Sequence, residues 1–256
     1  MHDDDVPVGR LLDRRQAMAL FGIAGATLAT TAGVLSRPAA AATKPMGIHH
    51  LNCVVRPEQM EGPYFVDEKL NRSDIRSDPS DGTMRPGTLF TLNLDIQEIV
   101  DGDCRPIKGA VVDTWQCDAL GVYSDVADQG TVGKKYLRGY QVTDENGKVQ
   151  FVTILPGWYQ GRAVHHHIKV RTTGTDGKPY EFTSQLYFHE EFKAGYFTKE
   201  PYASRGMPDT TNSADWIFTG SHGDQLLLDP TSAQDGYAAD FSIGLDLSDT
   251  EVGKED

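Results

Sequence analysis

Two histidines separated by one residue, His165 and His167, are the side chains of this sequence best suited to bind a metal ion. Successive side chains of a β-strand point to opposite faces, so both imidazoles project from one face while His166 projects from the other. Neutral imidazole nitrogens are common ligands of transition metals. The stretch 156–170 is therefore predicted to carry half of a metal site.

Most histidines on half-buried strands only pack and form hydrogen bonds, so the neighbouring sequence must decide between packing and metal binding. The loop before the pair contains Gly157 and Gly161, which allow the backbone to approach a site closely, and it supplies Tyr159 and Arg162. These neighbours favour a functional site. A cupin-type iron or zinc site also begins with His-x-His, but it needs a carboxylate about four residues later, where this chain has Arg171.

A second group of polar residues lies upstream, in the stretch 111–125. Taken alone, this stretch predicts a strand, a turn at residues 118–121 and an exposed Tyr123. A single tyrosine in such a place is more often structural than functional. Its meaning therefore depends on the stretch that carries the histidines.

Together these stretches resemble the intradiol ring-cleaving dioxygenases, the family of catechol, protocatechuate and hydroxyquinol dioxygenases, and within it the small exported members. The resemblance extends from about residue 61 to residue 188, about half of the chain. Four features occur in the order typical of the family: Glu61-Gly-Pro-Tyr-Phe65, Asp113-x-Trp-Gln-x-Asp-x-x-Gly-x-Tyr123, Pro156-Gly-x-Tyr159 with Arg162-x-x-His165-x-His167, and Gln185 before an apolar pair.

The resemblance implies an iron site. The side chains that match the iron ligands of the family are Tyr123, Tyr159, His165 and His167. Arg162 and Gln185 match residues that face the substrate ring. Two phenolates are hard anionic donors that stabilise Fe(III) over Fe(II), so the implied cofactor is Fe(III).

The chemistry implied by the resemblance opens a catecholic ring between its two hydroxylated carbons and places both atoms of O2 in a cis,cis-muconate-type diacid. Tyr159 matches the axial tyrosinate, which accepts a substrate proton and leaves the metal. Arg162, permanently charged, would stabilise the developing negative charge. The implied partners are a catecholic small molecule and O2, and the loops that read the substrate do not transfer from the family.

Two alternatives from other functional classes remain open at this point. A β-sandwich protein could bind iron or catecholates without turnover, and a zinc or copper protein could use the histidines alone. Two tyrosines argue against zinc or copper, because such sites rarely recruit two phenolates. Arg162 and Gln185 favour an enzyme over a binding protein. His166 departs from the aliphatic residue of many relatives and places a polar side chain on the face assigned to the core.

The elements that must position these residues are short strands. Apolar and polar residues alternate from Phe90 to Ile96, and runs of strand composition follow at 149–154, 164–170, 182–188 and 241–246. No long amphipathic helix is apparent. The pattern predicts an all-β fold, an antiparallel β-sandwich whose function is carried on long loops and strand ends.

The first 42 residues resemble a twin-arginine export signal. Arg14-Arg15 precede the apolar run 17–28, and small residues at 38–42 resemble a cleavage site. We therefore expect residues 1–42 to be removed and residues 43–256 to form one β-sandwich domain. The domain is expected in the periplasm, at the cell surface or secreted, without stable membrane insertion after signal removal.

Charge restricts the partners further. The chain has 24 Lys and Arg against 37 Asp and Glu, a formal net charge of −13. The predicted signal carries as many basic as acidic residues, so the exported domain keeps the same net charge. An acidic domain of this kind argues against nucleic acid as a partner. A homo-oligomer is compatible with the sequence.

Three cysteines, Cys53, Cys104 and Cys117, occur in a chain expected in an oxidising compartment. One bridge and one remaining thiol are the expectation. We predict a bridge between Cys104 and Cys117, which flank a turn and a strand-like run. Spacing alone leaves pairings of Cys53 with either partner open.

Overall fold

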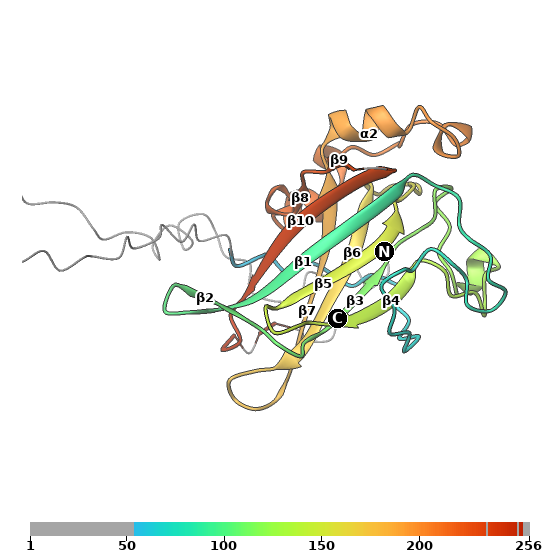
Figure 1. The fold of residues 1–256 in the computed structure, drawn as a ribbon. Coiled ribbons are helices and arrows are strands. Elements are labelled where there is room, and N and C mark those ends of the chain that lie inside the picture. The colour runs from blue at the N-terminus through green and yellow to red at the C-terminus, as the bar shows by residue number, and fades with distance from the viewer. Residues whose placement is uncertain (1–53, 234, 250, 253–256) are drawn as a thin grey trace, which may run out of the picture.

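The described part of the chain in this computed structural model is residues 54–233, 235–249 and 251–252, and it folds into two five-stranded sheets (Figure 1). The strands are β1 (Leu89–Val100), β2 (Asp103–Pro106), β3 (Val111–Trp115), β4 (Arg138–Val142), β5 (Lys148–Ile154), β6 (His165–Thr173), β7 (Pro179–Phe188), β8 (Leu227–Leu228), β9 (Thr231–Ala233) and β10 (Gly236–Leu245). The predicted export signal, residues 1–42, lies outside the described residues.

The first sheet is built around β1. β10 pairs in parallel with one edge of β1, whereas β5 and β2 pair antiparallel with its other edge, and β9 pairs with β10. Burial alternates along β1, with Phe90, Leu92, Leu94 and Ile96 buried. The alternation predicted for this strand is thus confirmed.

The second sheet has the order β4-β3-β6-β7-β8. All of its pairs are antiparallel except the short pair of β7 and β8. The register places Trp115 of β3, His167 of β6 and Gln185 of β7 side by side. Three residues far apart in sequence are therefore neighbours across one face of this sheet.

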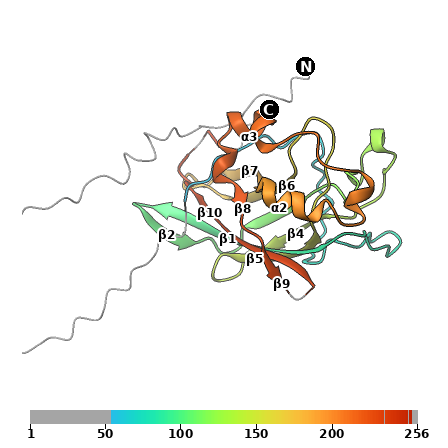
Figure 2. The same cartoon turned by 90° about the horizontal axis from the view of Figure 1, so that it is seen from above.

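The sheets pack face to face, as the view from above shows for β1, β5 and β10 against β6 and β7 (Figure 2). Apolar side chains of both sheets form one buried cluster that includes Phe90, Leu92, Phe151, Ile243, Val112, Ile168, Val170, Phe182 and Leu186. Burying each such side chain contributes roughly 1.5–3 kcal/mol. The β-sandwich is confirmed, and the two parallel pairs make both sheets mixed.

Helices occupy mainly the long connection after β7. They are α2 (Glu190–Tyr196), α3 (Trp216–Gly220) and the 3-10 helices η3 (Tyr202–Ser204), η4 (Asn212–Ala214) and η5 (Gly223–Gln225), while η2 (Ala127–Gln129) lies earlier. Phe192 of α2 packs on Phe188, and Phe218 of α3 packs on Tyr187, so both helices are fastened to β7. Within the described residues, no helix has the length and apolar character needed to cross a membrane.

The cysteines differ from the prediction. Cys104 on β2 is disulfide-bonded, but Cys117 is a free, buried thiol. The predicted bridge between Cys104 and Cys117 is therefore wrong. β3 runs its full length between the two residues, a span of roughly 17 Å, whereas a disulfide needs Cα atoms within about 7 Å. Cys53 lies outside the described residues.

Candidate metal and catalytic site

β6 carries both predicted imidazole ligands on the face of the second sheet that is turned away from the sandwich core. His165 and His167 are each 2% exposed, and their Nε2 atoms are 3.0 Å apart. Their neighbours across the strand pair of β6 and β7 are Tyr187 and Gln185. Trp115 stacks on the His167 ring, with centroids 4.7 Å apart and planes 9° from parallel. The surrounding rings thus fix the orientation of these imidazoles.

Hydrogen bonding selects the tautomer of His165. Its Nδ1 lies 2.6 Å from the carbonyl oxygen of Ala163, which can only accept, so Nδ1 carries the proton and Nε2 keeps its lone pair. Burial, reinforced by the charge of Arg162, lowers the pKa of His165 to about 3, and burial also lowers the pKa of His167. Both rings are therefore neutral near pH 7, the form that binds metals.

The two predicted tyrosine ligands come from the loops after β3 and before β6. Because β3 and β6 are antiparallel neighbours, the end of β3 lies beside the start of β6 and the two loops meet. Gly121 makes this contact tight: its φ is +82°, and a Cβ atom there would lie 2.0 Å from the carbonyl oxygen of Trp158. The rings of Tyr123 and Tyr159 come within 5.7 Å, centroid to centroid.

Both phenol rings lie next to the two histidines. Tyr159 Oη lies 3.1 Å from Nε2 of His165, and the Tyr123 ring lies 6.2 Å from that of His167. Tyr123 is 0% exposed, so the exposed position expected from its local sequence alone is wrong, because Tyr64 stacks on its ring at 4.5 Å. Burial raises the pKa of Tyr123, with a further contribution from Tyr159, and burial outweighs Arg162 to raise the pKa of Tyr159.

These four side chains fit a ferric ion. The buried hydroxyl of Tyr123 has no hydrogen-bond partner, although a buried hydroxyl normally finds one. A metal ion would give it a partner, and phenolate is a hard donor suited to Fe(III). Among the described residues, no cluster of three or more His, Cys, Asp and Glu side chains is placed to hold a metal. The donors beside the two imidazoles are therefore phenolic.

The predicted substrate-facing residues lie beside this group and contact each other. Arg162 is 15% exposed, and its Nη2 donates to Oε1 of Gln185 at 2.5 Å. Gln185 is buried, and its Nε2 donates to the carbonyl oxygen of Met60 at 3.0 Å. The structure thus brings Arg162 and Gln185 together with the predicted ligands Tyr159 and His165.

Sequence reasoning missed Asp215, a buried carboxylate whose Oδ2 accepts from Nε of Arg162 at 2.9 Å. Burial alone would raise its pKa, but Arg162 and the amide of Ala163 hold the pKa of Asp215 below its usual value. An aspartate directly before the apolar helix that starts at Trp216 is an N-cap signal. That signal predicts a helix start and contains nothing about Arg162.

His166 projects from the opposite face of β6, as its position between the two ligands predicts. It is 0% exposed, and its Nδ1 lies 2.6 Å from Oε1 of Gln116, while Nε2 contacts Oγ1 of Thr114. Gln116 in turn accepts from Oγ1 of Thr153 on β5 at 3.1 Å. His166 therefore belongs to a buried polar network that links the second sheet to the first.

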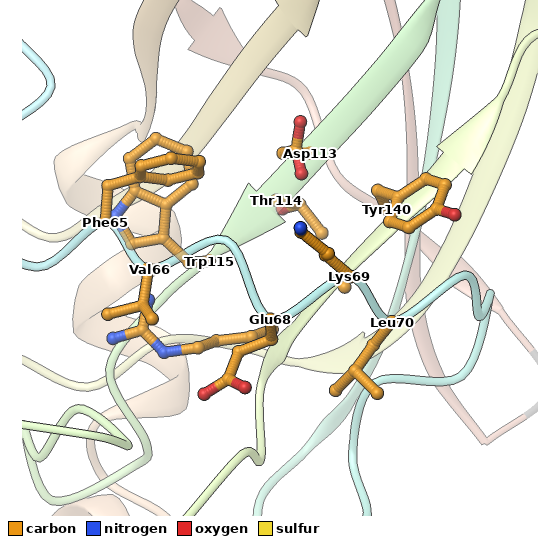
Figure 3. Close-up of a pocket in the computed structure, with 11 residues that line it drawn as sticks. Phe65, Val66, Glu68, Lys69, Leu70, Asp113, Thr114, Trp115 and Tyr140 are labelled. Carbon is orange, nitrogen blue, oxygen red and sulfur yellow. The ribbon is translucent and has the colours of Figure 1, made fainter. Parts of the chain in front are cut away.

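A separate small pocket borders the site. It is lined by residues that include Phe65, Lys69, Asp113, Trp115 and Tyr140. Figure 3 shows the Phe65 ring lying against Trp115, whose ring also stacks on that of His167. None of the four predicted ligands lines this pocket, so it lies next to the metal-binding residues and does not contain them.

Comparison with known proteins gives one family. A family model described as Dioxygenase matches residues 60–194. The catechol 1,2-dioxygenase of Acinetobacter baylyi is 33% identical over 109 residues, which cover 40% of this chain and 32% of that protein. The alignment thus spans about a third of that curated relative.

Two solved structures are similar over a larger share of their length. An intradiol ring-cleavage dioxygenase from Tetranychus urticae has a TM-score of 0.65 at 30% identity, covering 76% of this chain and 96% of that one. The dioxygenase domain of a dioxygenase and carbohydrate-binding protein fusion from Streptomyces sp. SirexAA-E has a TM-score of 0.55 at 30% identity, covering 75% and 99%.

Proposed function

Because the chain belongs to the intradiol ring-cleavage dioxygenase family, we propose that it is an oxidoreductase that opens catecholic rings between the two hydroxylated carbons. Both atoms of O2 would enter a cis,cis-muconate-type product, and the cofactor would be Fe(III). Tyr123, Tyr159, His165 and His167 would hold the ion. When bound, Fe(III) would accept both catecholate oxygens as ligands and make the ring reactive toward O2.

The observation that supports this proposal most is the convergence of two phenols and two neutral imidazoles at one buried place. The Nε2 atoms of His165 and His167 are 3.0 Å apart, Tyr159 Oη is 3.1 Å from the first of them, and the Tyr123 hydroxyl lacks a partner. A cation would give the Tyr123 hydroxyl the partner that it lacks, and an unpaired buried hydroxyl is destabilising by about 1–3 kcal/mol.

The side chains of the protein have separate tasks in this reaction. Tyr159, which is only partly buried, would accept a proton from the substrate hydroxyl and would have room to move away from the ion. Tyr123 is fully buried and would remain in place. The guanidinium of Arg162 is held by its hydrogen bond to Gln185. It would supply fixed positive charge where negative charge develops on the substrate ring.

Colour and oxygen uptake test the proposal. Iron-loaded protein should be wine-red from tyrosinate-to-Fe(III) charge transfer, and it should consume O2 with catechol, protocatechuate, hydroxyquinol or an alkylated or chlorinated catechol. Product analysis must give a ring-opened diacid. A coloured protein that binds catechols without consuming O2 would be a binding protein, and a colourless protein that stays inactive after iron loading would refute both functions.

We also propose export through the twin-arginine pathway, supported by Arg14-Arg15 and the alanine-rich stretch that ends at Ala42. Replacing both arginines by lysine should leave the precursor in the cytoplasm. Normal export of the double variant would contradict the assignment.

A further inference from the structure

We propose that Asp215 is a positioning residue for ring cleavage: its carboxylate fixes the guanidinium of Arg162 and the backbone that leads into the histidine strand. The inference rests on the proposed function, because it assigns Asp215 a task in that reaction. Asp215 lies in the connection after β7, 53 residues from Arg162, and is 0% exposed. A carboxylate buried this completely needs strong partners, and each of its oxygens has a different set.

The two carboxylate oxygens of Asp215 have different hydrogen-bond partners. Oδ1 accepts from the backbone amides of Ile217 at 2.8 Å and Phe218 at 3.3 Å, which caps α3. Oδ2 accepts from Nε of Arg162 at 2.9 Å and from the backbone amide of Ala163 at 2.7 Å. Capping of α3 uses only Oδ1, so Oδ2 is free to bind Arg162 and the amide of Ala163.

The Oδ2 contact holds the Arg162 guanidinium at its Nε atom. An arginine side chain is flexible, and its guanidinium must be held at both ends to meet a substrate in one orientation. Asp215 holds Nε, while Gln185 accepts from Nη2 at 2.5 Å. The remaining nitrogen, Nη1, makes no hydrogen bond to the described residues, which leaves a donor that can face substrate.

Oδ2 of Asp215 also influences the orientation of His165 at the start of β6. Asp215 Oδ2 accepts from the amide of Ala163, and the carbonyl oxygen of Ala163 accepts from Nδ1 of His165 at 2.6 Å. That second bond directs the lone pair of His165 Nε2 toward His167. Asp215 therefore orients both the substrate-facing cation and, through one peptide, the first histidine.

The segment that carries Asp215 is itself anchored by the buried ammonium group of Lys193. Lys193 of α2 is 1% exposed, and its Nζ donates to Oδ1 of Asn212 at 2.7 Å and to Oε1 of Glu190 at 2.8 Å. Asn212 Nδ2 donates to the carbonyl oxygen of Phe188 at the end of β7. The carboxylate is thus held against the sheet, as a positioning role requires.

A double-mutant cycle between Asp215 and Arg162 tests the proposal. Asp215→Asn and Asp215→Ser both retain an oxygen that can cap α3, but neither supplies a negative charge to Arg162. In the full-length iron-loaded protein, with rates normalised to bound iron, Asp215→Asn should lower kcat/KM for catechol by about 100-fold. The loss should be mainly in kcat, because Arg162 meets charge that develops during the reaction. In an Arg162→Gln background the loss should be at least tenfold smaller.

Asp209→Asn is the matched control. Asp209 lies on the same segment and accepts from the amide of Gly161 at 3.2 Å, but it is exposed and does not contact Arg162. The substitution removes the same charge and keeps an acceptor oxygen, so kcat/KM should stay within about twofold of the wild type.

A second measurement does not depend on turnover. In the metal-free full chain, the Nε proton of Arg162 should exchange slowly with solvent, and Asp215→Asn should accelerate that exchange. Failure of the wild-type protein to cleave catechols would refute the proposed function, and the exchange would still test the positioning role. Equal losses of kcat/KM in both Arg162 backgrounds, unchanged exchange, or unfolding of both Asp215 variants would overturn it.

Discussion

His166 offers the sharpest separation between metal binding and folding, because it stands between the two proposed ligands on the opposite face of β6. Its Nδ1 lies 2.6 Å from Oε1 of Gln116, and Thr114 contacts its Nε2. His166→Ala removes both hydrogen bonds from the core but no proposed ligand. We expect the variant to keep the iron and colour of the wild type and to be less stable.

The expected loss of unfolding free energy follows from the hydrogen bonds that Thr114 and Gln116 keep in the variant. Thr114 Oγ1 can still donate to the carbonyl oxygen of His167 at 3.0 Å, and Gln116 Oε1 still accepts from Thr153 at 3.1 Å. Each lost bond therefore costs about 1 kcal/mol without an added penalty for a stranded group. The space left by the imidazole adds about 1 kcal/mol. The total, about 3 kcal/mol, should lower the midpoint of thermal unfolding by about 6–12 °C.

The assay compares three alanine variants in the same preparation. Iron per chain and the visible spectrum report the metal site, and thermal and urea unfolding report the fold. His165→Ala and His167→Ala should lose iron, whereas His166→Ala should lose stability. Equal iron loss in all three variants would refute the assignment of faces on β6, and an unchanged unfolding midpoint in His166→Ala would refute the energetic account.

Three further outcomes are expected. Burial lowers the pKa of His166 to about 3 from the usual value near 6.5, so its neutral form stabilises the fold above about pH 6.5 and this contribution declines, by up to about 1.4 kcal/mol per pH unit, as the pH falls toward 3. In urea titrations the difference in unfolding free energy between wild type and His166→Ala should therefore narrow as the pH falls and change sign near about pH 4. A constant difference would contradict the shift. Tyr159→Phe should bind some iron and substrate but turn over slowly, whereas Tyr123→Phe should lower ferric affinity and remove the charge-transfer band that persists with anaerobic catechol; unchanged turnover in Tyr159→Phe would rule out its role as proton acceptor. Cys117 is 2% exposed and burial raises its pKa, so iodoacetamide should modify it only after unfolding, and mass-spectrometric detection of the adduct in folded protein would contradict its burial.

Local patterns predicted the strands well, but they could not identify strand partners. The alternation from Phe90 to Ile96 gives both the strand and its buried face. It does not contain the parallel pairing of β1 with β10, which joins Leu89 to Gly236 and depends on the whole sandwich. The cysteine prediction failed for a similar reason: closeness in sequence suggested a bridge, while an extended strand separates Cys104 from Cys117.

At the site, the positions of residues on strands could be predicted from the sequence, whereas those of residues on loops could not. The facing of His165 and His167 comes from strand periodicity, so the sequence was sufficient to predict it. The burial of Tyr123 depends on Tyr64, which arrives from a segment about 60 residues earlier and stacks on its ring. Asp215 could be read from the sequence only as a helix cap, because nothing local indicates that its second oxygen binds Arg162.

The sheet supplies only part of the site, and buried charges fix the rest. β6 and β7 provide His165, His167 and Gln185, whereas both tyrosines and Arg162 lie on loops, which are usually more mobile than strands. Arg138 is 2% exposed, and its guanidinium donates to the carbonyl oxygens of Ser124 and Tyr64, joining the Tyr123 loop to the segment that covers it.

Asp215 does the equivalent with opposite charge, because its oxygens accept from backbone amides of two segments, the loop that carries Ala163 and the helix α3. A guanidinium provides several donors in a fixed plane and a carboxylate provides two acceptor oxygens, so each can hold two segments at once. Burying a charge is unfavourable unless its hydrogen bonds are made, and each bond is lost if its loop moves away. That penalty opposes movement of these loops, and rigid placement is what the proposed metal site, made from four separate side chains, requires.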